Sequence, residues 1–79
     1  MVSPQDIERW IAAALSCEKL EVKGDGHHFD AVIVSGEFRG KNMVQQHQLV
    51  YKALGERMRE EIHALSMKTY TPEDWANRQ

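Results

Sequence analysis

The segment Phe29–Ser35 constrains the fold most strongly, because it is rich in β-branched and aromatic residues, the composition that favours a strand. Phe29, Ala31 and Ile33 would face one side of a sheet, and the two valines between and after them would face the other. We therefore predict a central strand that is covered over much of both faces. Such a strand needs neighbours on either side, which the rest of the chain has to supply.

Two other segments alternate apolar and polar residues as strands do. Residues 20–23 (LEVK) are followed by Gly24-Asp25-Gly26, a turn signal, which predicts a hairpin with the segment Phe29–Ser35. Residues 63–70 (HALSMKTY) predict a third strand. Because a helix separates the second and third strands, these two would be joined by a right-handed crossover if they are parallel.

The first helix is predicted over residues 3–16. Ser3 would cap it, Pro4 would occupy its first position, and apolar residues recur at helical spacing behind them. Residues 35–41 contain two glycines and are expected to form an irregular connection.

Two further helices follow the same logic. Asn42 and Gln45 form a capping-box pattern that opens a helix over residues 42–59, loosened at Gly55. Thr71 before Pro72 opens a short terminal helix that docks Trp75. The expected order is αββαβα, with a mixed three-stranded sheet and helices on one face. This is an α+β two-layer sandwich, and a length of 79 residues makes it one domain, residues 1–79.

Composition excludes several classes of protein. The net charge of −2 gives no overall positive field to hold a polyanion. Cys17 is the only cysteine, which rules out an intramolecular disulfide and a cysteine-built metal site, and it favours a reducing compartment. The N-terminal residues do not resemble a signal peptide, and no run of 18 apolar residues occurs. We expect a cytoplasmic protein that does not span a membrane.

Four histidines are the residues best suited to bind a metal. His27 and His28 lie in the predicted hairpin loop, where they are free to act as ligands, although a solvated loop residue and a strand-initial residue are the simpler interpretation. His47 lies within a helix, where a partly buried imidazole bonded to a backbone carbonyl is expected. His63 follows a charged helix end, where the helix dipole would favour a cation.

No catalytic constellation is present. The sequence lacks HExxH, GxSxG, P-loop and GxGxxG patterns, and nothing near Cys17 marks it as a nucleophile. We predict that the isolated chain is not an enzyme and acts by binding a partner.

Several segments, GDGHHF, FRGKNMVQQHQLVY and IHALSMKTYTPEDW with the leading amphipathic helix, together resemble the BolA-like family, particularly its short-loop bacterial branch, over nearly the whole chain. The most specific match is residues 63–72 with Trp75, which resembles the family's HAL strand and T-P-x-x-W helix start. The family's F-x-G and R-H-x-x-V-Y patterns are matched by Phe38, Gly40, His47, Val50 and Tyr51. Gln46 stands where many members have arginine. The family's class II KH-like fold agrees with the predicted order of elements.

The resemblance implies an accessory protein that pairs with monothiol glutaredoxins to bind, sense or transfer a [2Fe–2S] cluster. The partner's cysteine and a glutathione thiol would ligate one iron, and histidines of this chain would ligate the other. His63 matches the family's C-terminal histidine ligand, and the second ligand would be His27 or His28, between which the sequence does not choose. Imidazole ligands would raise the reduction potential and make ligation sensitive to pH. The isolated chain would hold no cofactor.

An alternative is a nucleic-acid-binding regulator of transcription or of a stress response, which the KH-like fold and some relatives suggest. KH modules use a GxxG loop with basic flanks, whereas residues 38–42 contain one glycine and offer only Arg39 and Lys41 as nearby cations. The glutaredoxin interpretation is therefore favoured over DNA binding. Alone, the chain is expected to be a monomer or a weak homodimer.

Overall fold

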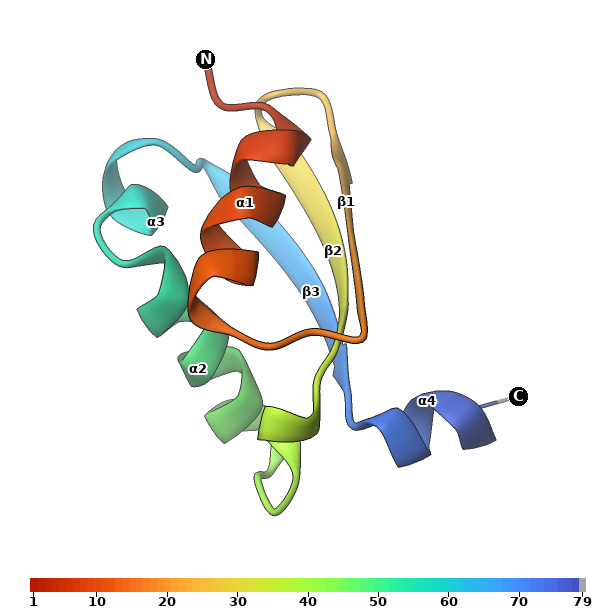
Figure 1. Ribbon diagram of the computed structural model, residues 1–79. Helices are drawn as coiled ribbons and strands as arrows, with labels where there is room; N and C mark the ends of the chain where they lie inside the picture. The colour runs from red at the N-terminus through yellow and green to blue at the C-terminus, as the bar shows by residue number, and fades with distance from the viewer. Residues whose placement is uncertain (79) are drawn as a thin grey trace.

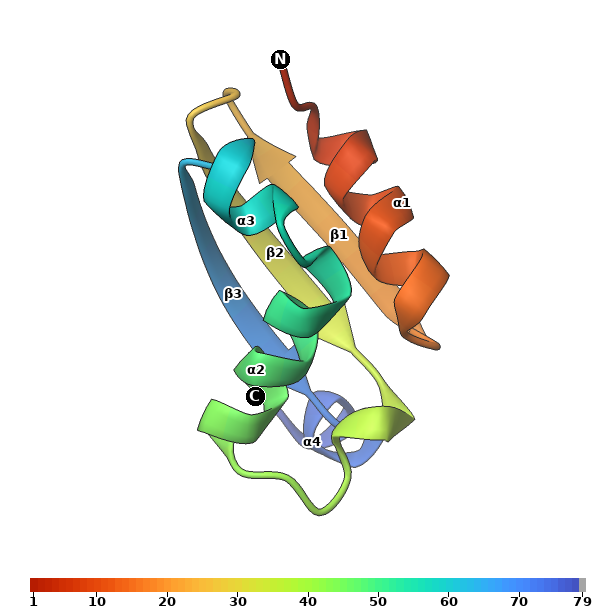
Figure 2. The same ribbon diagram turned by 90° about the vertical axis from the view of Figure 1, so that its left-hand side faces the viewer.

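The computed structural model describes residues 1–78 as a helical layer on a small sheet (Figure 1). The elements are α1 (Pro4–Ala14), β1 (Lys19–Gly24), β2 (His28–Val34), the 3₁₀ turn η1 (Gly36–Phe38), α2 (Met43–Leu54), α3 (Arg57–Glu60), β3 (Ala64–Tyr70) and α4 (Pro72–Asn77). The strand order is β1-β2-β3, with β1 antiparallel and β3 parallel to β2. Helices α1 and α2 lie on the same face of the sheet (Figure 2). The predicted α+β sandwich with a mixed three-stranded sheet is confirmed.

Helix α1 begins where its capping signal predicts. The Ser3 hydroxyl accepts a hydrogen bond from the Asp6 backbone N–H at 3.1 Å, and the Asp6 carboxylate accepts one from the Ser3 backbone N–H at 3.0 Å. Ile7 and Ile11, one turn apart, are fully buried.

Among residues 1–78, no helix has the length and the apolar character that crossing a membrane requires.

Strand β2 is central, as predicted, but its two faces are covered unequally. Phe29, Ala31 and Ile33 are at most 2% exposed and belong to the core beneath the helices. On the other face, Asp30 is exposed, and only Val34 is fully enclosed there, next to Tyr70 at the end of β3. The prediction that much of both faces is covered was therefore wrong for most of the strand, because the long helices pack on one side only.

The predicted helix over residues 42–59 is two helices. Gly55 ends α2 with a φ of +59°, a left-handed conformation that a helix does not continue through, and the short α3 starts two residues later. The capping box is present, since Asn42 and Gln45 exchange side-chain to backbone hydrogen bonds at 2.9 Å. Gly55 thus divides the connection between α2 and β3.

The connection predicted to be irregular contains the ordered turn η1. The Ser35 hydroxyl donates to the Ser16 carbonyl at 2.7 Å and accepts from the Glu37 backbone N–H at 3.1 Å. This arrangement buries Phe38 completely. The turn is therefore part of the hydrophobic core.

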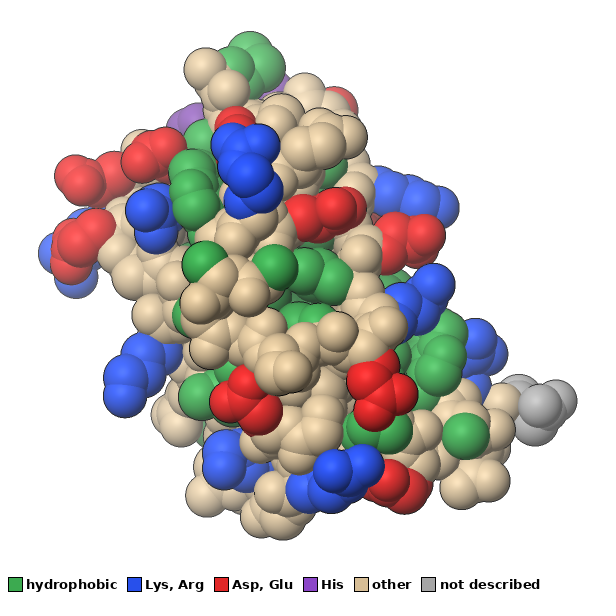
Figure 3. Space-filling view, viewed as in Figure 1, with side chains coloured by type: hydrophobic (Ala, Val, Ile, Leu, Met, Phe, Trp, Pro, Cys, Tyr) green, Lys and Arg blue, Asp and Glu red, His purple; other side chains and the backbone are tan. Residues whose placement is uncertain are grey.

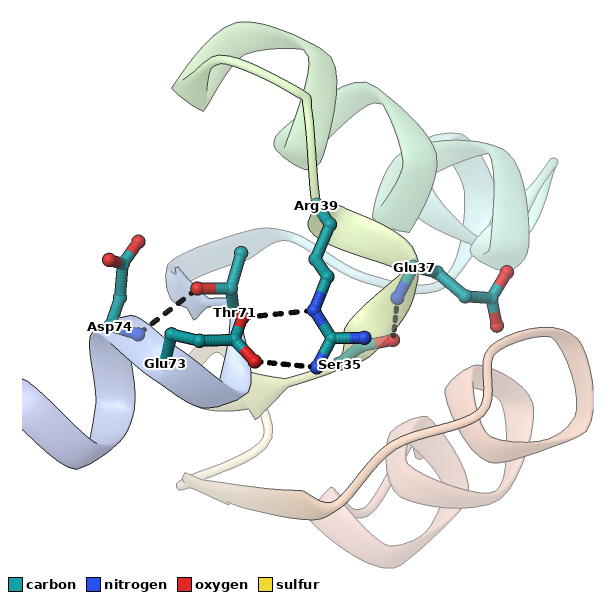
Figure 4. A network of polar contacts seen from close by, with 6 residues as sticks. All are labelled: Ser35, Glu37, Arg39, Thr71, Glu73 and Asp74. Atoms are coloured by element: carbon teal, nitrogen blue, oxygen red, sulfur yellow. Dashed lines mark hydrogen bonds and ion pairs between the residues drawn. The ribbon is translucent and has the colours of Figure 1, made fainter.

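Helix α4 is attached beyond the end of the sheet by polar and aromatic contacts. The Arg39 guanidinium donates two hydrogen bonds to the Glu73 carboxylate, at 2.9 and 2.7 Å, and the Thr71 hydroxyl caps the helix by accepting from the Asp74 N–H at 3.0 Å (Figure 4). The Trp75 ring packs against Tyr70 at 5.2 Å between ring centroids. The predicted docking of Trp75 is confirmed.

Acid is expected to loosen α4 through Glu73. The hydrogen bonds from Arg39 lower the pKa of this carboxyl below its usual 4.5, so the contact contributes stability above pH 4.5 and loses it as pH falls through the depressed pKa. Trp75 fluorescence, recorded in a Trp10→Phe background, should change in that acidic range. Glu73→Gln should already show the acid-type signal at neutral pH. An unaltered pH profile in Glu73→Gln would show that this pair does not hold α4.

Candidate functional site

The hairpin loop and the start of β3 bring two of the predicted ligands together. The parallel register pairs His28 with Ala64, so the residues just before them, His27 and His63, are neighbours at the same end of the sheet. Their ring centroids are 5.5 Å apart and their planes are inclined by 39°. His28 precedes Phe29, which points into the core, so alternation along β2 turns His28 toward the open face of the sheet. The structure therefore pairs His27, and not His28, with His63.

The loop that carries His27 is held by a residue that the sequence analysis treated only as part of a turn. One carboxylate oxygen of Asp25 accepts hydrogen bonds from the backbone N–H groups of His27 and His28, both at 2.9 Å. These two bonds, the one from His28 foremost, lower the pKa of the Asp25 carboxyl. The Asp-Gly pair was the available signal, because aspartate side chains commonly bond to the backbone two residues on.

Two glycines permit the tight path of this loop. Gly26 has a φ of +99°, which side chains disfavour. A Cβ atom at Gly24 would lie 2.5 Å from the His28 carbonyl oxygen. The position of His27 is thus set by the backbone of the turn and by the Asp25 carboxylate together.

The paired imidazoles suit a metal that is shared with another molecule. His27 and His63 are both exposed, which leaves them accessible to a partner. Within residues 1–78, no group of three or more His, Cys, Asp and Glu side chains is placed to hold a metal ion. An iron of a [2Fe–2S] cluster takes two protein ligands, and imidazoles can replace thiolates on one iron. The donor set therefore fits one half of such a cluster.

His47 lies away from the histidine pair and, unlike it, is not exposed. It is half-buried on α2, which begins at the opposite end of the sheet from the hairpin loop (Figure 1). Its Nε2 is enclosed and has no hydrogen-bond partner in the part of the chain that the structure describes. The predicted bond to a backbone carbonyl is therefore not made by this nitrogen.

The two cations of the nucleic-acid alternative, Arg39 and Lys41, lie between η1 and α2, far from the histidine pair (Figure 1). Arg39 is engaged by the Glu73 carboxylate, whose hydrogen bonds raise the pKa of the guanidinium. Lysine and arginine side chains alternate with acidic ones over the face in Figure 3 and form no basic stripe. The local positive charge at this loop is consequently small.

Comparison with known proteins gives consistent matches. The family model described as BolA-like protein matches residues 11–74. The acid stress protein IbaG of Escherichia coli K12 is 40% identical over 72 residues, which cover 90% of this chain and 86% of that protein. The DNA-binding transcriptional regulator BolA of Haemophilus influenzae is 43% identical over 53 residues, which cover 67% of this chain and 52% of that protein. The solved structure of a bolA protein homologue from Coxiella burnetii superposes with a TM-score of 0.88 at 46% identity, covering 98% of this chain and 100% of that one.

Proposed function

This chain belongs to the BolA-like family, and from that premise we propose that it pairs with a monothiol glutaredoxin to bind, sense or transfer a [2Fe–2S] cluster. Members of the family are regulatory or accessory proteins, and the relatives compared above are named as a stress protein and as a transcriptional regulator. The observation that supports the proposal is the contact between the rings of His27 and His63.

In the proposed complex, His27 and His63 would each hold the same iron by one ring nitrogen. The partner's cysteine and the thiol of glutathione would hold the other iron. The cluster would supply a one-electron redox centre whose potential rises when imidazoles replace thiolates. Two neutral ligands bind more weakly than two thiolates, which suits a protein that receives and releases its cluster.

The residues of this chain have separable tasks. His63 follows the buried Ile62 and leads into β3, so its backbone is anchored on both sides. His27 is oriented by Asp25 through the loop backbone, as an outer residue orients a metal ligand. His28 is left free on the open face of the sheet. The proposal therefore assigns ligand roles to His27 and His63 and a positioning role to Asp25.

The test is a reconstitution under anaerobic conditions. The protein is mixed with a monothiol glutaredoxin, glutathione, iron and sulfide, and visible absorption and circular dichroism spectra are recorded. We expect a spectrum that differs from that of the glutaredoxin with glutathione alone, with one copy of each protein per cluster. If the mixture only reproduces the spectrum of the glutaredoxin, the proposed shared cluster does not form.

DNA binding is expected to be weak and strongly reduced by salt. The net charge is negative, and Arg39 is already paired with Glu73, so few phosphate contacts are available. Electrophoretic mobility shifts at increasing salt measure this. Sequence-specific binding at nanomolar concentrations in physiological salt, lost in Arg39→Ala with Lys41→Ala, would instead favour the regulator function.

A further inference from the structure

The outward face of α2 lacks charge although the chain as a whole is rich in it. No Lys, Arg, Asp or Glu occurs between Lys41 and Lys52, whereas 28% of the chain is charged. Apart from Met1, the exposed large apolar residues among residues 1–78 all lie on α2, namely Met43, Val44 and Tyr51. Val44 and Tyr51 are 64% and 43% exposed. An exposed face without charge and with apolar side chains does not help to keep the domain soluble.

The fold does not use this face either. Helix α2 buries Val50 and Leu54, which are both completely enclosed, on another side. Val44, Gln48 and Tyr51 follow the spacing of one helical stripe and all are exposed. Their side chains therefore form a continuous surface that has no partner within the described residues.

We propose that this α2 face, defined as Val44, Gln48 and Tyr51 with Lys41 and Lys52 at its ends, docks a protein whose contact surface has an uncharged centre and carboxylates at both ends. The centres of protein interfaces are depleted in charge and enriched in tyrosine. Lys52 lies in the last turn of α2, and Lys41 lies just before the N-cap residue of the helix; both are exposed. Neither lysine forms an ion pair with another residue of the described chain. Both are therefore available to a partner's acidic groups.

Charge also selects among the possible occupants. If two copies of this chain packed α2 against α2 antiparallel, Lys41 of each would approach Lys52 of the other, and parallel packing would bring like residues together. Either arrangement opposes like charges at both ends. A nucleic acid would need cations along the stripe, whose centre has none. A different protein whose contact surface has carboxylates at both ends and an uncharged centre would match both the lysines and the uncharged stripe of the α2 face.

This face is independent of the cluster proposal. Helix α2 begins at the end of the sheet remote from the loop that carries His27 (Figure 1, Figure 2), and the Val44, Gln48 and Tyr51 side chains of the α2 face are exposed. The docked protein can therefore bind while His27 and His63 are engaged by another molecule. The inference does not rest on the glutaredoxin complex and survives its failure.

Photo-crosslinking of the full chain tests the proposal. A benzophenone amino acid replaces Val44, and in the matched control it replaces Glu21, an exposed residue on the open face of the sheet. In an extract of the cells that naturally contain the protein, we expect a discrete adduct with another protein from position 44 and none from position 21. Lys41→Glu with Lys52→Glu should lower the yield by roughly tenfold, because like charges would then face each other. Lys41→Arg with Lys52→Arg should retain it.

A captured protein supports the proposal only if its cross-linked segment lies between acidic residues and if, once purified, it binds the wild type but not Val44→Glu with Tyr51→Glu. Circular dichroism in the far ultraviolet confirms that each variant is folded. The proposal is overturned if the adduct is a second copy of the chain or a nucleic acid. It is equally overturned by equal yields at both positions, by no adduct, or by a yield that ignores the charge reversal.

Discussion

His63→Ala is expected to abolish the distinctive circular dichroism spectrum of the reconstituted complex or to shorten the lifetime of its cluster at least tenfold. Removing one of two imidazoles would leave an iron one ligand short, and loss even of a residue that only supports a ligand commonly costs 10- to 100-fold in metal affinity. The fold should be preserved, because the His63 side chain is exposed. Spectra and decay times of wild type and variant, at equal protein concentrations, give the measurement.

The neighbouring histidines provide the matched controls. His27→Ala should reproduce the loss, since the His27 ring faces His63 at 5.5 Å, whereas His28→Ala should leave the spectrum nearly unchanged. His47→Ala should also leave it unchanged. A loss in His28→Ala with retention in His27→Ala would mean that the loop rearranges on binding and that the ligand assignment is wrong. Wild-type behaviour in His63→Ala would place the cluster on other residues altogether.

Phe38→Ala is expected to lower the free energy of unfolding by about 3–5 kcal/mol, the usual range for removing a fully buried aromatic side chain. Domains are stable by only ~0.05–0.15 kcal/mol per residue, so a short chain could lose most of its stability. Urea unfolding followed by far-ultraviolet circular dichroism measures the change.

Phe38→Leu serves as the control for Phe38→Ala, because it keeps most of the buried volume and should cost less than the alanine variant. A cost of under about 1 kcal/mol for Phe38→Ala would show that the turn η1 adapts to the cavity and is not a fixed part of the core. The comparison thus tests whether this connection stabilises the domain.

Much of the fold could be predicted from local sequence signals, namely helix caps and the alternation of apolar residues. The caps at Ser3, Asn42 and Thr71 start helices where predicted, since each side chain has a backbone N–H to accept from. Apolar alternation located the strands, and a mixed sheet was expected because a helix separates the second strand from the third. Gly55 was recognised as a weak point, but whether a glycine bends or ends a helix depends on its φ, which the sequence does not state.

Coverage of the sheet and the burial of Phe38 depend on contacts between distant segments. The apolar residues on both sides of β2 suggest two packed faces, yet long helices pack on only one of them. Phe38 is a single aromatic residue between two glycines, and this pattern does not by itself show that the side chain turns inward. The coverage of the sheet and the burial of Phe38 are set by tertiary packing, which local sequence patterns do not predict.

For the candidate site, too, local sequence patterns predicted one part, and the other part depends on tertiary contacts. The sequence supplied His27, His28 and His63 as candidates, and local patterns could not choose between the first two. The choice comes from the register of β2 and β3, in which one residue of offset moves a side chain to the other face of the sheet. Arg39 was named as one of two cations of the nucleic-acid alternative, and its pairing with Glu73 joins residues too far apart in sequence for any motif to reveal.

The parallel pairing of β2 with β3 makes the histidine pair a product of complete folding. His27 and His63 lie on opposite sides of α2 in the chain, so no local hairpin can bring them together, and the contact forms only after the crossover helix has closed a long loop. An unfolded or half-folded molecule offers two scattered imidazoles and no bidentate site. A ligand that bridges the two rings would bind the native state alone and would raise its melting temperature with the logarithm of its concentration, once that concentration exceeds Kd. In the proposed complex, therefore, only a correctly folded domain would receive the cluster.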